Sequence, residues 1–145
     1  MTVAEWIQKY PGLAVTVPPD TPQEELVDQM LAEPALRDIY VAGEDGVVLG
    51  HVTHKKLATL FLAEHCPSHT RRQILGRITD WLAEDLMNAN FAYARPEDEL
   101  DEVLYRLLDH ELEDLPVIDR QGRLLGTINL SFVIRELRRR ESPTS

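Results

Sequence analysis

The chain contains one internal repeat. Residues 19–61 recur as residues 96–137, with matching positions 76 or 77 residues apart. The matched glycines and helix starts are Gly46 with Gly122, Gly50 with Gly126, and Thr53 with Asn129. The apolar matches pair Leu26, Val27, Met30 and Leu31 with Val103, Leu104, Leu107 and Leu108, and Leu57, Ala58 and Phe61 with Val133, Ile134 and Leu137. Two copies of one supersecondary unit restrict the fold more than any single motif does.

Each copy predicts the order strand, helix, strand, strand, helix. In the second copy, residues 115–128 form two short apolar runs around a polar turn at 119–122, which ends in a glycine that tolerates positive φ. The preceding helix carries apolar residues at i, i+3, i+4, i+7 and i+8, and we expect it to bury them: Leu100, Val103, Leu104, Leu107 and Leu108.

The start of the first copy's helix has a recognisable signature. Thr21 suits the N-cap, Pro22 the first helical position, and Glu24 the third, which together predict a capping box. In the second copy Asp98 and Asp101 replace Thr21 and Glu24.

Composition narrows the class of protein. A chain of 145 residues, 43% of them hydrophobic, is long enough to build one domain with its own core. No apolar run approaches the roughly 20 residues that cross a bilayer, so we expect no direct membrane insertion. A formal net charge of −10 argues against nucleic-acid binding, which relies on Lys and Arg. The single cysteine, Cys66, excludes an internal disulfide and fits a cytoplasmic location.

The two copies resemble the cystathionine-β-synthase (CBS) domain, which occurs in tandem as a Bateman module. In the second copy the resemblance is carried by Asp85 to Met87, Pro96 to Asp98, Leu115 to Asp119, Gly122, and Leu125 to Ile128. In the first copy it is carried by Val15 to Asp20, Ile39 to Val41, Gly46, and Leu49 to Thr53. The resemblance covers nearly the whole chain.

The resemblance implies an α/β (α+β) fold of two tandem βαββα repeats packed pseudosymmetrically through their sheets. To this we add an N-terminal helix, predicted from the amphipathic residues 2–10, and a helical connection between the repeats. We therefore expect a single CBS-pair domain over residues 1–145. Its expected parts are repeat one at about 3–63, the connection at about 64–84, repeat two at about 85–140 and a polar tail at 141–145.

The resemblance also implies a function. Such modules form homodimers, sense adenine nucleotides or related adenosyl ligands, and regulate an attached or partner transporter, channel or enzyme. The ligands to expect are AMP, ADP, ATP or S-adenosylmethionine. No required cofactor and no enzyme activity are expected.

The ligand motif implied by the resemblance runs Gly, two residues, Ser or Thr, two residues, Asp, and the Asp holds the ribose hydroxyls. Gly50 and Thr53 match this motif, but Lys56 stands at the Asp position. In the second copy, Asn129 and Phe132 replace the last two motif residues. Because lysine has no acceptor for the ribose hydroxyls, we expect ligand recognition here to differ from the family's.

Charge near the two motifs predicts an asymmetric pair of sites. Thr53 and Asn129 suit helix N-caps, and the start of a helix attracts anions. His54, Lys55 and Lys56 add positive charge in the first repeat only. We expect the first repeat to bind a phosphate or another anion and the second to be degenerate or apolar. The candidate ligand-binding residues are Thr16, Val17, Gly50, Thr53, His54, Lys56, Tyr93, Asn129 and Phe132.

Two alternatives remain open. The replaced Asp positions favour a structural dimerisation module that has lost its ligand. A metal-responsive switch is suggested by a metal-like cluster, because imidazole and thiolate suit zinc, although the spacing matches no zinc motif. Its members are His51 and His54 together with His65, Cys66 and His69, the three that could approach each other on one turn. We assign no metal ligand and no catalytic residue. The arginines that end the last predicted helix, Arg135 and Arg138 to Arg140, suit the helix dipole, with an acidic partner as the alternative.

Overall fold

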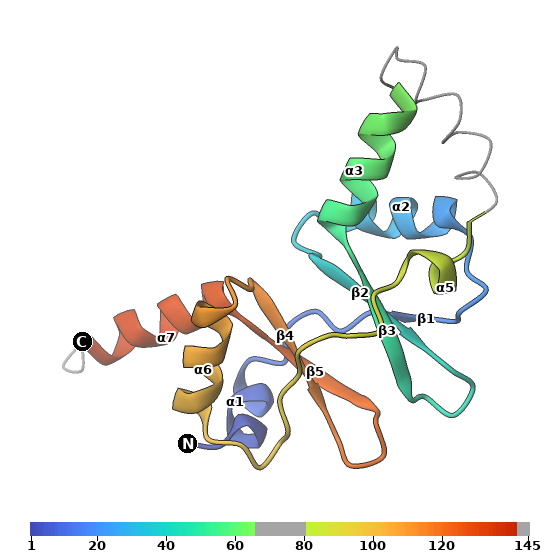
Figure 1. Ribbon diagram of the computed structural model, residues 1–145. Helices are drawn as coiled ribbons and strands as arrows, with labels where there is room; N and C mark the ends of the chain where they lie inside the picture. The colour runs from blue at the N-terminus through green and yellow to red at the C-terminus, as the bar shows by residue number, and fades with distance from the viewer. Residues whose placement is uncertain (66–80, 142–145) are drawn as a thin grey trace. The chain divides into compact units, whose positions relative to one another are not determined.

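The chain forms two compact units, each built around one of the two repeats (Figure 1). The computed structural model describes residues 1–65 and 81–141. We call Val15–Phe91 the first-repeat unit, and Met1–Ala14 together with Ala92–Ser145 the second-repeat unit. The first 14 residues therefore pack with the later repeat. Most of the connection predicted at about 64–84 lies outside the described residues.

The first-repeat unit has a three-stranded sheet covered by helices. Its elements are β1 (Thr16–Val17), α2 (Gln23–Ala32), β2 (Asp38–Ala42), β3 (Val48–Thr53), α3 (His54–His65) and α5 (Ala83–Leu86). Strand β1 runs parallel to β2, and β2 pairs antiparallel with β3. The turn between β2 and β3 contains Gly46 at φ 83°, the backbone conformation for which the turn needs a glycine. This is the predicted order of strand, helix, strand, strand and helix.

The second-repeat unit follows the same plan with a smaller sheet. Its elements are α1 (Val3–Lys9), α6 (Leu100–Asp109), β4 (Asp114–Ile118), β5 (Leu124–Asn129) and α7 (Leu130–Glu141). Strands β4 and β5 form an antiparallel hairpin. The first strand of this repeat is reduced to one parallel bridge between Ala94 and Val117. With that difference, the predicted mixed fold of two βαββα repeats is confirmed.

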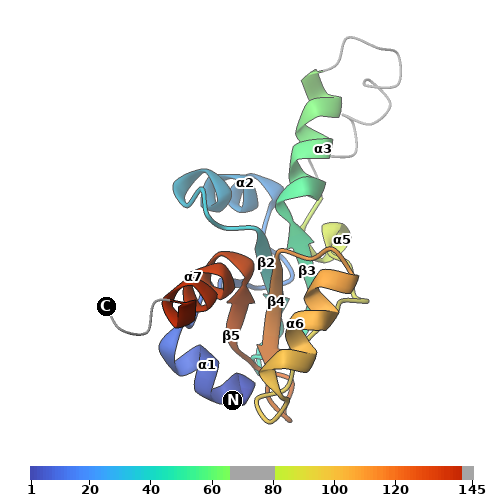
Figure 2. The ribbon, with the colours of Figure 1, turned by 90° about the vertical axis from the view of Figure 1, so that its left-hand side faces the viewer.

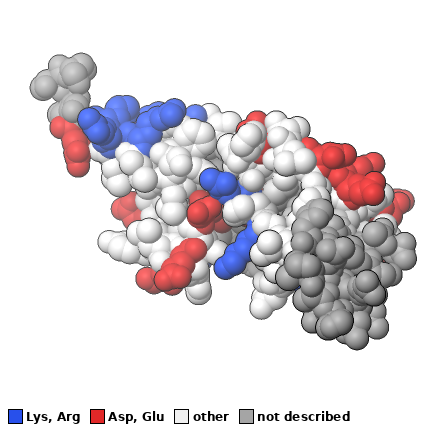
Figure 3. All heavy atoms as spheres, turned by 90° about the horizontal axis from the view of Figure 1, so that it is seen from above, with Lys and Arg blue, Asp and Glu red and all other residues white. Residues whose placement is uncertain are grey.

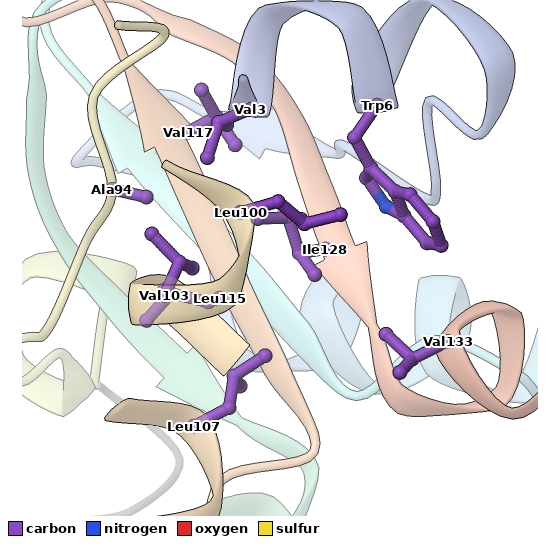
Figure 4. Close-up of a cluster of buried hydrophobic side chains, with 10 residues drawn as sticks. All are labelled: Val3, Trp6, Ala94, Leu100, Val103, Leu107, Leu115, Val117, Ile128 and Val133. Atoms are coloured by element: carbon purple, nitrogen blue, oxygen red, sulfur yellow. The ribbon is translucent and has the colours of Figure 1, made fainter. Parts of the chain in front are cut away.

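Three helices cover one side of the β4–β5 hairpin. Figures 1 and 2 show α1, α6 and α7 on the same side of the two strands. They enclose the apolar core drawn in Figure 4, whose buried members are Val3, Trp6, Ala94, Leu100, Val103, Leu107, Leu115, Val117, Ile128 and Val133. Trp6, from the predicted N-terminal helix, is only 1% exposed. The N-terminal helix is therefore part of the core of the second-repeat unit.

The corresponding helices α2 and α6 each bury one face and expose apolar residues beside it. Helix α6 buries Leu100, Val103 and Leu107. The expectation that Leu108 is buried is wrong, since its exposed fraction is 61%. An α-helix advances about 100° per residue, so Leu108 lies roughly 100° round the helix from the buried line. Its counterpart Leu31 on α2 is 74% exposed for the same reason.

Both predicted helix starts need correction. Helix α2 begins at Gln23 after Pro22, and the Thr21 hydroxyl donates a hydrogen bond to the carbonyl of Pro18 at 2.8 Å. Thr21 and Glu24 therefore form no capping box. In the second repeat, the Asp98 carboxylate accepts a hydrogen bond from the backbone N–H of Arg95 at 2.9 Å. These polar side chains stabilise the turns before the helices, where local hydrogen bonds compete with capping.

Within the described part of the chain, every helix is too short or too polar to span a bilayer.

Candidate ligand site

A polar pocket lies within the first-repeat unit, where β3 meets the first turn of α3. Its volume is about 400 Å³. The residues that line it are His51, Thr53, Lys56, Leu86, Met87, Asn88 and Ala89. Among these described lining residues there is no carboxylate, while Lys56 supplies an ammonium donor. The wall is therefore suited to an anionic or neutral polar group rather than to a cation.

Gly50 brings one wall of this pocket close to the sheet. The backbone N–H of His51 donates to the carbonyl of Asn88 at 3.1 Å, and the N–H of Asn88 donates back at 2.9 Å. A Cβ atom on Gly50 would lie 2.8 Å from that same Asn88 oxygen and 2.8 Å from the Met87 sulfur. Only glycine permits this close approach, and the segment that follows α5 is held against β3 as a result.

Thr53 is the N-cap of α3, as predicted. Its hydroxyl oxygen accepts a hydrogen bond from the backbone N–H of Lys56 at 3.0 Å. The cap positions Lys56 on the first turn, where its side chain is exposed and lines the pocket. The positive end of the α3 dipole and the Lys56 ammonium therefore act on the same space.

His51 is a pocket residue that the ligand motif does not include. Its Nδ1 atom lies 3.2 Å from a carboxylate oxygen of Asp38 on β2. We assign a proton to Nδ1 because a carboxylate only accepts hydrogen bonds. The ring is also stacked with Tyr40, at 6.3 Å between centroids, and contacts Phe91 at 5.8 Å. Asp38 and the two rings hold the imidazole in one orientation.

Sequence reasoning placed His51 with other histidines as a weak metal cluster. The signal that could have found its role was its position beside Gly50, two residues before Thr53 on the same strand. Side chains alternate along a strand, so His51 and Thr53 share a face. Met87 and Asn88, which are also pocket residues, had no comparable signal.

The other candidates in the first-repeat unit do not line this pocket. Thr16 and Val17 form the short strand β1, and Val17 is buried in the apolar core. The His54 ring nitrogen lies 3.2 Å from the carbonyl oxygen of Arg37. His54 lines an apolar groove between α2 and α3 instead, with a volume of about 490 Å³. The structure thus brings Thr53 and Lys56 together in the wall of one pocket, and Gly50 lies against Met87 and Asn88 of the same wall.

The remaining three candidates belong to the second-repeat unit. The side-chain amide of Asn129 donates to Asp114 at 2.6 Å and accepts from the backbone N–H of Ser131 at 2.8 Å. Phe132 stacks on Tyr10, with ring centroids 5.2 Å apart and planes at 20°. Tyr93 is 40% exposed, and the Arg95 guanidinium lies 5.1 Å from its ring centre. The polar group of Asn129 is therefore already engaged within its own unit.

Glu136 forms a buried ionic centre between α1 and α7. Its carboxylate accepts hydrogen bonds from Arg139 at 2.7 Å, from Lys9 at 3.0 Å and from the Tyr10 hydroxyl at 3.0 Å. These donors hold the pKa of the Glu136 carboxyl well below its usual range, with Arg139 the largest cause. The basic last turn of α7, which includes Arg139, lies in the cluster of Lys and Arg at that helix end (Figure 3). Arg139 and Arg140 thus have Glu136 as a local partner as well as the helix dipole.

The candidate metal cluster receives no structural test. Cys66, His69 and the side chain of His65 lie outside the described residues. Elsewhere in the described residues, no three His, Cys, Asp or Glu side chains are grouped so as to hold a metal ion.

Comparison with protein families identifies the repeat. The family model of the CBS domain matches residues 14–63 and 83–138. The chain belongs to the CBS domain family. The two matched segments correspond to the two repeats found in the sequence, so the resemblance drawn from Gly50, Gly126 and their neighbours is confirmed. A comparison with curated protein sequences gave no match.

Solved structures of CBS pairs share this fold. CBSX2 from Arabidopsis thaliana, solved in complex with AMP, has a TM-score of 0.74 at 20% identity, covering 97% of this chain and 98% of CBSX2. The CBS domain pair of MJ0100, in complex with 5′-methylthioadenosine and S-adenosyl-L-methionine, has a TM-score of 0.69 at 15% identity, covering 94% and 95%. The cytosolic domain of the Mg²⁺ channel MgtE, in complex with ATP, has a TM-score of 0.64 at 23% identity, covering 84% and 44%.

The two CBS repeats differ in chemistry at the same motif position. Lys56 lines an open polar pocket in the first repeat, whereas Phe132 is engaged in a ring stack in the second.

Proposed function

We propose that this CBS pair is a regulatory, non-catalytic module that binds an adenine nucleotide or a related adenosyl or anionic small molecule in the pocket of the first repeat. It would control an attached or partner transporter, channel or enzyme in the cytoplasm. The observation that carries the proposal is the combination of Thr53, Lys56 and His51 around a pocket of about 400 Å³. A pocket of this size is in the range of small-molecule sites.

The chemistry of the wall favours the phosphate part of such a ligand. Lys56 and the capped start of α3 attract negative charge, and a charge-assisted hydrogen bond is stronger than a neutral one. Lys56 stands where the family's ribose carboxylate is expected, so the hydroxyls of a ribose gain no acceptor from that position. Support for a nucleotide comes from CBSX2, MgtE and MJ0100, which were solved with AMP, ATP and adenosyl ligands respectively.

The test begins with the ligand. Mass spectrometry of the purified protein would detect a co-purified nucleotide, and calorimetry with AMP, ADP, ATP, S-adenosylmethionine and inorganic phosphate would measure affinity. We expect Lys56→Ala to weaken binding of the preferred ligand by about tenfold or more, since a hydrogen bond to a charged group contributes about 1.5–3 kcal/mol. The proposal fails if none of the five compounds binds.

Lys55→Ala is the matched control. Lys55 has the same charge, lies on the same exposed turn of α3 and is absent from the pocket wall. Equal effects of the two substitutions would mean that general surface charge, and not this pocket, attracts the ligand. Binding should also weaken as NaCl rises from 50 to 500 mM, because salt screens the attraction between Lys56 and an anion. Lys56→Ala removes that charge, so the affinity of this variant should depend less on salt.

A homodimer is the second part of the proposal, and a ligand-free dimerisation module is the alternative function. Each repeat exposes apolar residues on its pair of helices: Leu31, Phe61 and Leu62 on α2 and α3, and Tyr105, Leu108, Ile134 and Leu137 on α6 and α7. Leu31, Phe61 and Leu62 line one apolar groove, and contiguous apolar surface marks protein interfaces. Dimer formation without any ligand binding would favour the structural module.

The metal-responsive switch has no supporting contact within the described residues. Titration with zinc, compared between the wild type and His65→Ala, would test it directly.

A further inference from the structure

Helix α1 of the second-repeat unit corresponds to helix α5 of the first-repeat unit. Both begin with an antiparallel bridge to the residues before the repeat's first long helix, between Thr2 and Glu99 in one unit and Pro22 and Leu82 in the other. Both are followed by a carbonyl that accepts a hydrogen bond from the second strand of the hairpin. The acceptor is Pro11 in the second-repeat unit and Asn88 in the first.

The backbone correspondence makes Tyr10 the equivalent of Met87. The donors of the two hydrogen bonds are Thr127, to Pro11 at 3.0 Å, and His51, to Asn88 at 3.1 Å. Thr127 and His51 are themselves 76 residues apart and are equivalent in the repeat. Each acceptor directly follows the residue that ends its helix, Tyr10 for α1 and Met87 for α5.

The pocket wall of the first repeat can therefore be matched residue by residue. Thr53 corresponds to Asn129 and Lys56 to Phe132, both at an offset of 76. Met87 corresponds to Tyr10. In the first repeat, Lys56 and Met87 line open space. In the second, Phe132 and Tyr10 stack on each other at 5.2 Å, so two aromatic rings occupy the corresponding place.

The stack is held from both sides. Trp6 packs against Tyr10 with ring centroids 4.8 Å apart, and the Arg135 guanidinium lies 5.6 Å from the centre of the Phe132 ring. The Tyr10 hydroxyl donates a hydrogen bond to the Glu136 carboxylate at 3.0 Å. The Glu136 side chain is only 3% exposed, so the anchor is well shielded from water.

The first repeat lacks the means to build this anchor. The position equivalent to Glu136 is Leu60, a partly buried apolar residue packed against the core of the first-repeat unit. A leucine can neither accept a hydrogen bond from a hydroxyl group nor form an ion pair with a lysine. The anchor is therefore specific to the second repeat, as are the two rings that it fixes.

We propose that Tyr10 and Phe132, anchored through Glu136, fill the second repeat's counterpart of the pocket, so that each chain binds one ligand rather than two. Helix α1 then acts as an internal plug, and the N-terminal segment sets the number of sites. This inference rests on the proposed function of the first-repeat pocket.

The test transfers the first repeat's residues into the second. The double variant Tyr10→Met with Phe132→Lys reproduces Met87 and Lys56 at the equivalent places. Equilibrium dialysis with radiolabelled AMP would count bound molecules per chain at saturation. We expect one for the wild type and two for the double variant. The reciprocal double variant, Met87→Tyr with Lys56→Phe, should bind none.

Each outcome separates the two proposals. Two AMP molecules on the wild type, or no gain in the double variant, would overturn the plug. No binding to the wild type but one molecule on the double variant would support the plug and reject the function proposed for the first repeat. No binding to either would reject both. If circular dichroism shows that the double variant does not fold, Phe132→Lys alone replaces it, because this variant removes one ring, supplies the lysine and keeps the hydrogen bond between Tyr10 and Glu136, and a gain of one molecule is again expected.

Discussion

The hydroxyl of Tyr10 donates a hydrogen bond to the buried carboxylate of Glu136, 3.0 Å away, and so joins the end of α1 to the middle of α7. The two residues are 126 positions apart in the chain. Lys9 adds an ion pair to the same carboxylate at 3.0 Å. The N-terminal helix is thus fastened to the second repeat by polar contacts as well as by the burial of Trp6.

This centre predicts a pH-dependent stability. The pKa of Glu136 is lowered in the folded protein, so its contribution is complete above the unfolded value of about 4.3 and is lost as the pH falls below it. We expect Glu136→Gln to lower the thermal midpoint at pH 7, and the gap to the wild type to narrow from about pH 5 downwards. Thermal melts followed by circular dichroism between pH 7 and pH 3 measure this.

Glu141→Gln on the same helix is the control, because Glu141 is exposed. A surface substitution of this kind should change stability by no more than about 0.5 kcal/mol. A constant gap between Glu136→Gln and the wild type across the pH range would contradict the assignment.

Gly50 predicts a local steric effect. A methyl group on Gly50 would lie 2.8 Å from the backbone oxygen of Asn88, which has little freedom to move. We expect Gly50→Ala to cost about 1–3 kcal/mol in urea unfolding, as overpacking usually does, and to weaken ligand binding in the adjacent pocket.

Gly43→Ala provides the comparison for this substitution. Its added methyl would meet only a carboxylate oxygen of the Asp45 side chain, at 3.3 Å. That flexible group can yield, so the change should be close to neutral. Equal losses at the two positions would show that the approach of Asn88 is not the cause.

The N-cap at Thr53 predicts a moderate loss of stability. Thr53→Ala removes the acceptor for the Lys56 N–H and should cost about 1 kcal/mol. Thr59→Ala, on the same helix, removes only a hydroxyl that donates to the carbonyl of Lys55 at 2.8 Å. Such a bond adds little to a helix, and alanine is the better helix former, so this variant should be neutral or slightly stabilised. Chemical unfolding of both variants measures the two free-energy changes.

The exposed helix faces predict a change of oligomeric state. Leu31 and Leu108 occupy equivalent positions on α2 and α6, with exposed fractions of 74% and 61%. We expect Leu31→Asp with Leu108→Asp to convert a dimer into a monomer in light scattering coupled to size exclusion, because charge is costly in an apolar interface. Leu49→Asp, on β3 at 41% exposure, should leave the dimer intact. A wild-type protein that is monomeric in solution would contradict the proposed homodimer.

The local parts of the fold were predictable from patterns a few residues long. Gly46 and Gly122 mark the two hairpin turns, both with positive φ, and Thr53 marks the start of α3. Capping at Thr21 was less predictable because a threonine hydroxyl can serve the preceding turn equally well. Here it bonds to Pro18.

The candidate site was only partly predictable. Gly50, Thr53 and Lys56 follow one another along β3 and α3, so a linear motif keeps them together. His51 gained its role from Asp38 on the neighbouring strand, and Met87 and Asn88 came from a segment more than 30 residues away. Contacts of that kind depend on how the chain returns to the sheet, which periodicity does not encode.

The sequence by itself determined the repeated unit, the membership of the CBS family and the different residues at the two motif ends, because these are properties of residue identity and spacing. Tertiary structure alone decided that the N-terminal helix packs into the second repeat. It also decided that Tyr10 stacks on Phe132 and donates a hydrogen bond to Glu136. The physical reason is that an apolar face specifies burial but not its partner. The partner is chosen only when distant segments compete for the same surface.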